Sequence, residues 1–144
     1  MSVDPPGRSR SFLFVCDGNT CRSPLAEEVA RSLGVEAASA GVTALAGSAA
    51  TPQAVAVAEA LGLDIRDHRS RLLTRSDVED AANIYTMTQS QADWIVDRWP
   101  TSAGKVSRLD PERDIADPLG GSLDRYEAVA TQIRAAVNLR LRGG

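Results

Sequence analysis

The stretch FLFVCDGNTCRSPLAEEVA, residues 12–30, passes from an apolar run through a short polar loop into a helical pattern. The run at 11–16 has the length and continuous apolarity of a strand that is covered on both faces. Beyond the loop, apolar residues recur every four positions, at Leu25, Val29 and Leu33. This spacing predicts a helix, with Ser23 as its N-cap and Gly34 at its end. The stretch therefore predicts a strand, a tight loop and a helix in direct succession.

The rest of the chain continues to alternate strand-like and helix-like segments. Further strands are predicted at 35–42, 83–87 and 105–109, and further helices at 51–61, 76–81 (capped by Ser76), 90–99 and from about 123 onward. In the last of these, one face carries Tyr126, Ala130, Ile133, Val137 and Leu141. Strands that alternate with helices predict an α/β fold, with a parallel sheet covered by helices on both faces. Ligands of such sheets bind at the carboxyl ends of the strands, which is where the loop 16–23 lies.

Bulk properties limit the class of protein further. A chain of 144 residues with 43% hydrophobic and 24% charged residues is typical of a single globular domain, here expected over residues 11–144. Residues 1–10 contain two prolines and a glycine and are predicted to be a flexible lead-in without a secretory signal. A net charge of −3 argues against nucleic acid as a partner, and no apolar run is long enough to span a membrane. Two closely spaced cysteines and no disulfide framework indicate the cytoplasm.

The loop CDGNTCRS, residues 16–23, has the composition and position expected of an anion-binding loop, or cradle. Its successive backbone N–H groups can converge on one point, and the positive end of the following helix dipole adds to their field. Arg22 can return to the cradle and hold two oxygens of a phosphate in a bidentate fork. Gly18 is expected to permit a backbone conformation that a larger residue would resist. Cys16, at the end of the strand, would face the bound anion as a nucleophile in its thiolate form.

The two cysteines have other possible roles. Cys16 and Cys21 can be buried structural thiols, a disulfide or part of a metal clip. A metal clip needs more ligands than two cysteines and His68, the only histidine, conveniently supply. Arg22 and Ser23, directly after Cys21, favour the nucleophile over the structural reading.

The pattern Cys-x5-Arg-Ser after an apolar strand resembles the low-molecular-weight protein tyrosine phosphatases, which form a phosphocysteine intermediate. The fuller string VCDGNTCRSP at 15–24 lies close to the N-terminus, as in that family. The similarity continues in SAG at 39–41, in HRSRLLT at 68–74 and in Asp117-Pro118. It implies a four-stranded parallel sheet of order 2-1-3-4, with a phosphate-binding loop after the first strand. It also implies a phosphorylated protein as substrate, inorganic phosphate as product, and neither metal nor cofactor.

The resemblance also implies roles for individual residues. Cys16 would be the nucleophile, Arg22 would bind phosphate and stabilise the transition state, and Asp117 would be the general acid and then the base. The remaining members of the phosphate-binding loop would be Asp17, Gly18, Asn19, Thr20, Cys21 and Ser23. The loop would be supported by hydrogen bonds from Asn19, Ser39 and His68. Cys21 matches a second loop cysteine that, in relatives, can form a reversible disulfide with the nucleophile.

Three residues bear on the choice of substrate: Asp17, Thr20 and Leu119. Threonine at position 20, together with the GGS that follows Leu119, resembles the bacterial protein arginine phosphatases. Leu119 alone offers little apolar wall for a phosphotyrosine ring, whereas a hydroxyl and carboxylates suit a guanidinium. Asp17 opposes both the thiolate and an incoming phosphate, and a cationic substrate would offset that repulsion. The sequence therefore favours phosphoarginine slightly over phosphotyrosine.

Two alternative functions are less well supported. If Asp17 disables the thiolate, the chain would be a catalytically weak or silent phosphate-binding or redox-sensing module. Thioredoxin-coupled arsenate reductases share this loop, but they need further redox cysteines downstream, and this sequence has none after Cys21.

Overall fold

A computed structural model describes residues 11–143, so the predicted flexible segment 1–10 lies outside the described residues. Its centre is a four-stranded sheet of order β2-β1-β3-β4, in which all neighbouring strands are parallel. The strands are β1 (Phe12–Cys16), β2 (Ala37–Gly41), β3 (Asn83–Thr86) and β4 (Val106–Arg108). This arrangement confirms the predicted α/β fold and strand order.

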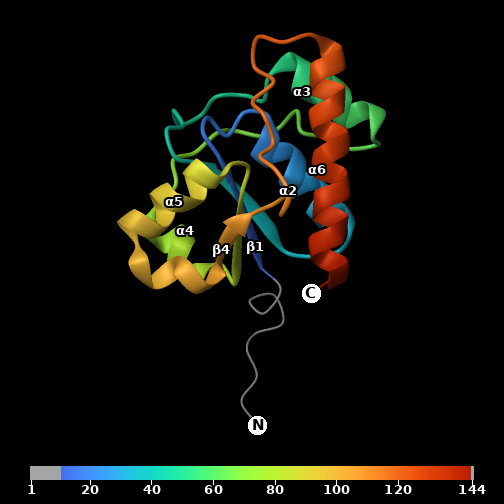
Figure 1. Cartoon of the computed structure of the whole chain (residues 1–144). Helices are drawn as coiled ribbons and strands as arrows, with labels where there is room; N and C mark the ends of the chain where they lie inside the picture. The colour runs from blue at the N-terminus through green and yellow to red at the C-terminus, as the bar shows by residue number, and fades with distance from the viewer. Residues whose placement is uncertain (1–10, 144) are drawn as a thin grey trace.

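Helices cover both faces of the sheet (Figure 1). On one face lie α2 (Arg22–Ser32), α3 (Pro52–Ala60) and α6 (Leu123–Gly143). On the other lie α4 (Arg75–Asp80) and α5 (Gln89–Arg98), followed by the 3₁₀ helix η1 (Pro100–Lys105). No helix within residues 11–143 is long and apolar enough to cross a membrane.

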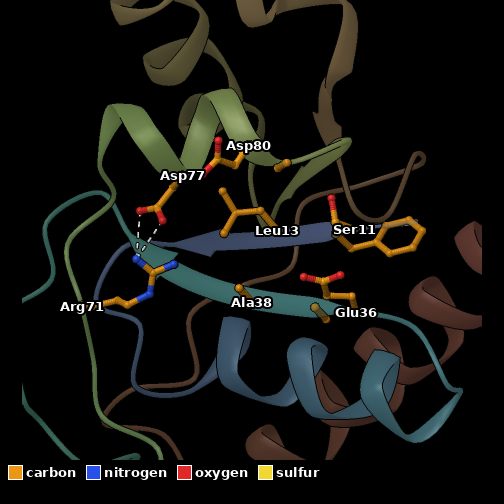
Figure 2. Close-up of a pocket in the computed structure, with 10 residues that line it drawn as sticks. Ser11, Leu13, Glu36, Ala38, Arg71, Asp77 and Asp80 are labelled. Carbon is orange, nitrogen blue, oxygen red and sulfur yellow. Dashed lines mark hydrogen bonds and ion pairs between the residues drawn. The ribbon is translucent and has the colours of Figure 1, made fainter. Parts of the chain in front are cut away.

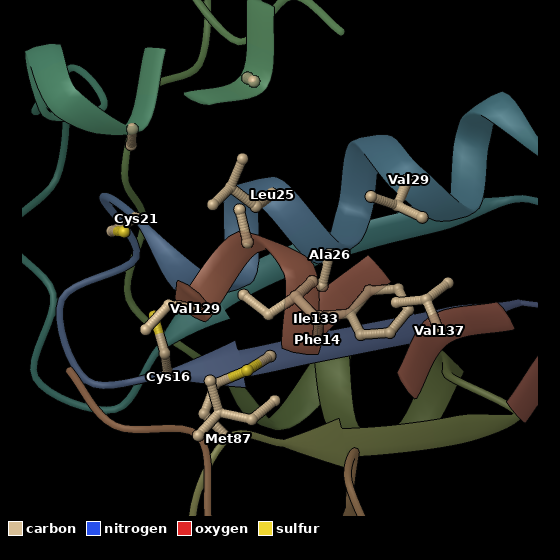
Figure 3. Packing of buried hydrophobic residues seen from close by; sticks show 14 of the residues in the cluster. Phe14, Cys16, Cys21, Leu25, Ala26, Val29, Met87, Val129, Ile133 and Val137 are labelled. Atoms are coloured by element: carbon tan, nitrogen blue, oxygen red, sulfur yellow. The ribbon is translucent and has the colours of Figure 1, made fainter. Parts of the chain in front are cut away.

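Strand β1 is the centre of the core and carries the nucleophile candidate at its end. Phe14 and Cys16 point toward α2 and α6, where Phe14 packs among buried residues including Ile133 and Val137 (Figure 3). Leu13 and Val15 point to the opposite face. Full burial of a side chain such as Phe14 contributes about 2 kcal/mol, so packing on both faces holds the strand in place. The position of Cys16 is thereby fixed by the sheet.

Most predicted helix boundaries agree with the structure, but two predicted N-caps are wrong. Helix α2 begins at Arg22, so Ser23 lies inside its first turn, and the Ser23 side chain bonds to loop residues instead of capping the helix. Helix α4 is capped by Thr74 and not by Ser76, because Thr74 and Asp77 form a reciprocal capping box. The local pattern located both helices but not their caps: α4 is capped by the Thr74 hydroxyl, whereas α2 begins after Cys21 without a side-chain cap.

Candidate active site

Cys16 ends β1 and its thiol lies inside the turn that leads to α2. The Sγ atom is 2.9 Å from the Ser23 hydroxyl oxygen and accepts a hydrogen bond from the backbone N–H of Asn19 at 3.2 Å. The strand's last carbonyl and the loop are held in turn by the segment after β2, where Val42 donates its N–H to the Cys16 oxygen. Cys16 is buried, so its sulfur contacts the Ser23 hydroxyl, the Asn19 N–H and the apolar core rather than solvent.

Asn19 is the central side chain of the loop and is completely buried. Its Nδ2 donates to the hydroxyls of Ser23 (2.8 Å) and Ser39 (3.0 Å), while its Oδ1 accepts the N–H of Arg71 (3.0 Å). Its backbone oxygen accepts a hydrogen bond from Nε2 of His68 at 2.8 Å. The predicted supporting residues are therefore brought together around Asn19.

The hydrogen bonds around Asn19 have a defined direction. The Ser39 hydroxyl is 2.5 Å from Oε1 of Glu27, and a carboxylate can only accept, so Ser39 donates to it. Ser39 must then accept from Asn19, which uses its other amide hydrogen on Ser23. The Ser23 hydroxyl hydrogen is consequently free to point at Cys16, where it can stabilise a thiolate.

The prediction for Gly18 is wrong: the loop residue with an unusual backbone conformation is Asn19. Gly18 has no positive φ, and a Cβ atom there would meet nothing closer than 3.7 Å. Asn19 has φ = 55°, in the left-handed region that asparagine tolerates better than most residues. The glycine that the loop needs is Gly41 at the end of β2, because a Cβ there would collide with the Asp17 carbonyl oxygen and lie 2.8 Å from the Ala44 Cβ.

Arg22 is almost fully buried, and its guanidinium is held by other groups of the protein. Its Nη1 donates to the Ile115 carbonyl oxygen at 2.9 Å. Its Nη2 lies 3.7 Å from Oδ2 of Asp17 and 3.8 Å from Oδ2 of Asp117. Both carboxylates are about half exposed (55% and 48%), so the guanidinium lies between two anions at the mouth of the loop.

The segment that carries Asp117 is shaped by its own turn. Oδ1 of Asp117 accepts the N–H of Leu119 at 3.0 Å, and Gly121 donates its N–H to the Pro118 oxygen. Gly120 has φ = 80°, and a Cβ on Gly121 would lie 2.9 Å from that same oxygen. The paired glycines are therefore required by the turn that follows Asp117.

The other predicted residues differ in how closely they approach the loop. Thr20 is half-buried, and its carbonyl oxygen accepts the N–H of Thr51. Leu119 is 66% exposed, which leaves it as a side chain on the rim. Cys21 is a buried free thiol and belongs to the same hydrophobic cluster as Cys16 and Leu25 (Figure 3). Burial first, and then the neighbouring Cys16, raise the pKa of the Cys21 thiol to about 12.

A separate groove of about 570 Å³ lies along the N-terminal halves of β1 and β2, under α4 (Figure 2). It contains none of the predicted site residues. Figure 2 shows the ion pair on its wall between Arg71 and Asp77, with Nη1 and Oδ1 2.9 Å apart. Because the backbone N–H of Arg71 bonds to Asn19, this pair links the capping box of α4 to the loop.

Sequence reasoning missed two side chains that contact the site. Glu27 accepts from Ser39, and Gln91 donates to Asp17 from 74 residues away at 2.9 Å. The pattern Thr88-x-x-Gln91 is a capping-box signature, so the sequence offered a signal for the start of α5. It offered none for the contact with Asp17, which depends on tertiary structure.

The fold places a buried thiol at the end of the first strand of a parallel sheet, in a turn that leads to a buried arginine, which is a cysteine-centred candidate site. Residues 11–141 match the family described as low molecular weight phosphotyrosine protein phosphatase. A relative named protein-arginine-phosphatase, from Geobacillus stearothermophilus, is 37% identical over 88% of this chain and 90% of its own. A relative named probable low molecular weight protein-tyrosine-phosphatase EpsP, from Ralstonia nicotianae, is 40% identical over 90% and 92%.

A solved structure extends this similarity to the fold. It is a YwlE arginine phosphatase variant with a phosphorylated active-site serine, and it has a TM-score of 0.83 and 31% identity. The match covers 88% of this chain and 90% of that one. The chain therefore belongs to the low-molecular-weight protein tyrosine phosphatase family, as its sequence motifs predicted.

Proposed function

We propose that the chain is a cysteine-dependent protein phosphatase that uses Cys16, Arg22 and Asp117. The observation that carries this proposal is the setting of the Cys16 sulfur. It lies between the Ser23 hydroxyl and the Asn19 N–H, at the base of a loop whose mouth holds Arg22. Both groups can donate a hydrogen bond to the attacking sulfur, and Arg22 can bind the phosphoryl oxygens.

In the first step the Cys16 thiolate attacks phosphorus. An S–P bond forms, the bond from phosphorus to the side-chain oxygen or nitrogen breaks, and Asp117 gives its proton to that leaving atom. Arg22 stabilises the charge on the transferring phosphoryl oxygens. Its contact with the Ile115 oxygen orients the guanidinium beforehand, so little reorganisation is needed.

In the second step water attacks the phosphocysteine. Asp117, now ionised, takes a proton from the water, the S–P bond breaks, and inorganic phosphate leaves with Cys16 again a thiolate. The hydrogen bond from Ser23 to the sulfur stabilises the departing thiolate. The whole cycle uses no cofactor.

We propose phosphoarginine as the preferred substrate over phosphotyrosine. Thr20 and the half-exposed carboxylates of Asp17 and Asp117 offer acceptors for a guanidinium, while Leu119 is the one apolar side chain among the predicted selectivity residues. The relatives carry both names, arginine phosphatase and tyrosine phosphatase, so family membership alone does not decide between the two substrates. The partners expected are phosphorylated proteins, in the reducing cytoplasm where the thiol is maintained.

The test is hydrolysis of matched phosphoarginyl and phosphotyrosyl peptides. The wild type should turn over both, with a higher kcat/KM on phosphoarginine, and Cys16→Ser should abolish both activities. Acid-quenched wild type should contain phosphate on Cys16. Thr20→Ile should shift the preference toward phosphotyrosine. Absence of turnover with retained phosphate binding would indicate the silent module, and equal or better phosphotyrosine turnover, unchanged in Thr20→Ile, would contradict the arginine preference.

A further inference from the structure

Gln91 is a buried amide whose orientation is fixed by the backbone of its own helix. It occupies the third position of α5, and its Oε1 accepts the N–H groups of Met87 (2.9 Å) and Thr88 (3.0 Å). An amide nitrogen could not satisfy these two donors, so Nε2 must point the other way. There it donates to Oδ1 of Asp17 at 2.9 Å.

Asp17 is consequently held at both carboxylate oxygens, although its side chain is about half exposed. Oδ1 accepts from Gln91, and Oδ2 lies 3.7 Å from Nη2 of Arg22. The backbone oxygen of Asp17 is also fixed, by the N–H of Thr43. A surface aspartate normally samples several rotamers in solvent, whereas this one has a single direction set from two elements.

The hydrogen bond from Gln91 does not neutralise the negative charge of Asp17. Gln91 is neutral, and within the described residues the ion pairs of Asp17 and Asp117 are both made with Arg22, at 3.7 and 3.8 Å. A phosphotyrosine adds only negative charge to this arrangement, whereas a phosphoarginine brings its own guanidinium. A neutral donor orients the Asp17 carboxylate without cancelling its charge, so the carboxylate can face both Arg22 and a cationic group of the substrate.

We propose that Gln91 is a positioning residue that holds Asp17 as the acceptor for the cationic side chain of the substrate. The inference deepens the proposed function and rests on it. The preference for phosphoarginine over phosphotyrosine then depends on a residue of α5 that does not itself touch the substrate.

Gln91→Glu tests this with little change elsewhere. Glutamate at the third helical position keeps the capping box and both backbone contacts, but it replaces the Nε2 donor by an oxygen that repels Asp17. We expect the ratio of kcat/KM for phosphoarginyl over phosphotyrosyl peptide to fall about tenfold, mainly through a higher KM for phosphoarginine. The exposed Gln89, two positions earlier, gives the control: Gln89→Glu adds the same charge to the same helix and should leave the ratio unchanged.

Asp17→Asn and the double variant complete the test. Asp17→Asn should lower the ratio to a similar extent, and adding Gln91→Glu to it should lower it no further, since both act through one carboxylate. If turnover depends on Cys16 but Gln91→Glu keeps the wild-type ratio, or if the losses in the double variant are additive, the inference is overturned and the proposed function stands. If the wild type shows no turnover that depends on Cys16, the proposed function and the inference are both overturned.

Discussion

The structure of the loop depends more on Asn19 than on any other of its side chains. Replacing it by alanine removes its three side-chain hydrogen bonds, to Ser23, Ser39 and the N–H of Arg71. At about 1 kcal/mol net for each bond, the loss is about 3 kcal/mol. Alanine at φ = 55° adds a strain of about 1 kcal/mol. We therefore expect Asn19→Ala to lower the free energy of unfolding by about 4 kcal/mol.

Asn19→Gly separates the two contributions. Glycine adopts the same φ without strain, so its loss should be about 1 kcal/mol smaller than that of alanine. Urea unfolding followed by tryptophan fluorescence measures both, because the two tryptophans of the chain, Trp94 and Trp99, pack against each other at the end of α5.

Activity should fall in both Asn19 variants under conditions where they stay folded. Without the amide, the Ser23 hydroxyl is no longer directed at Cys16, and loss of one oriented hydrogen bond to a thiolate lowers kcat about 10- to 100-fold. A loss of stability under 1 kcal/mol in Asn19→Ala would refute the account of Asn19 as the centre of the loop. Equal losses in the two variants would refute the strain argument alone.

Three further changes test neighbouring contacts. Glu27→Ala removes the acceptor that directs Ser39 and should lower kcat about fivefold, whereas Glu27→Gln, which keeps an acceptor oxygen, should retain most activity in the same assay. Gly41→Ala forces a methyl group against the Asp17 carbonyl and should cost about 1–3 kcal/mol in urea unfolding, with a loss of phosphate affinity measured by calorimetry. Because burial raises the pKa of Cys21 to about 12, the folded state keeps the thiol proton that the unfolded chain loses above pH 9, so stability should fall between pH 9 and 12 by about 4 kcal/mol. Cys21→Ala should lack that part of the slope, and an identical pH dependence in both proteins would contradict the buried-thiol assignment.

The sequence predicted the elements, and the family resemblance predicted the contacts of Asn19 with Ser39 and His68, but other contacts between elements were missed. Strand β1 and helix α2 were predictable because their patterns are local, and the strand order came from the family resemblance. The wrong cap at Ser23 and the wrong role for Gly18 share one cause, since in both cases the preference of a residue type was overridden by the path of the loop. Ser23 bonds to Asn19 and Cys16 instead of capping. The left-handed residue is Asn19 because its amide finds partners on β2 and in the segment before α4.

The distance along the chain explains what the sequence could not reveal. The contact between Asp17 and Gln91 joins residues 74 apart, and the one between Arg22 and the Ile115 oxygen joins residues 93 apart. Neither residue type is unusual at its position, so no local signal marks the pairs. Both become visible only when the carboxyl ends of β1 and β3 are placed side by side in the sheet.

The charges at the mouth show why the loop alone does not determine the substrate. In the proposed mechanism the loop of Cys16, Asn19 and Ser23 acts on the attacking sulfur and on the phosphoryl group, which phosphoarginine and phosphotyrosine share. Discrimination must come from what lies outside it, where Arg22 is flanked by two carboxylates. Asp117 has a proposed role there as the general acid and then the base, so its position is explained by the proposed chemistry. Asp17 performs no step in the proposed mechanism; its carboxylate pairs with Arg22, and under the proposed preference it also meets the cationic group that a phosphoarginine brings.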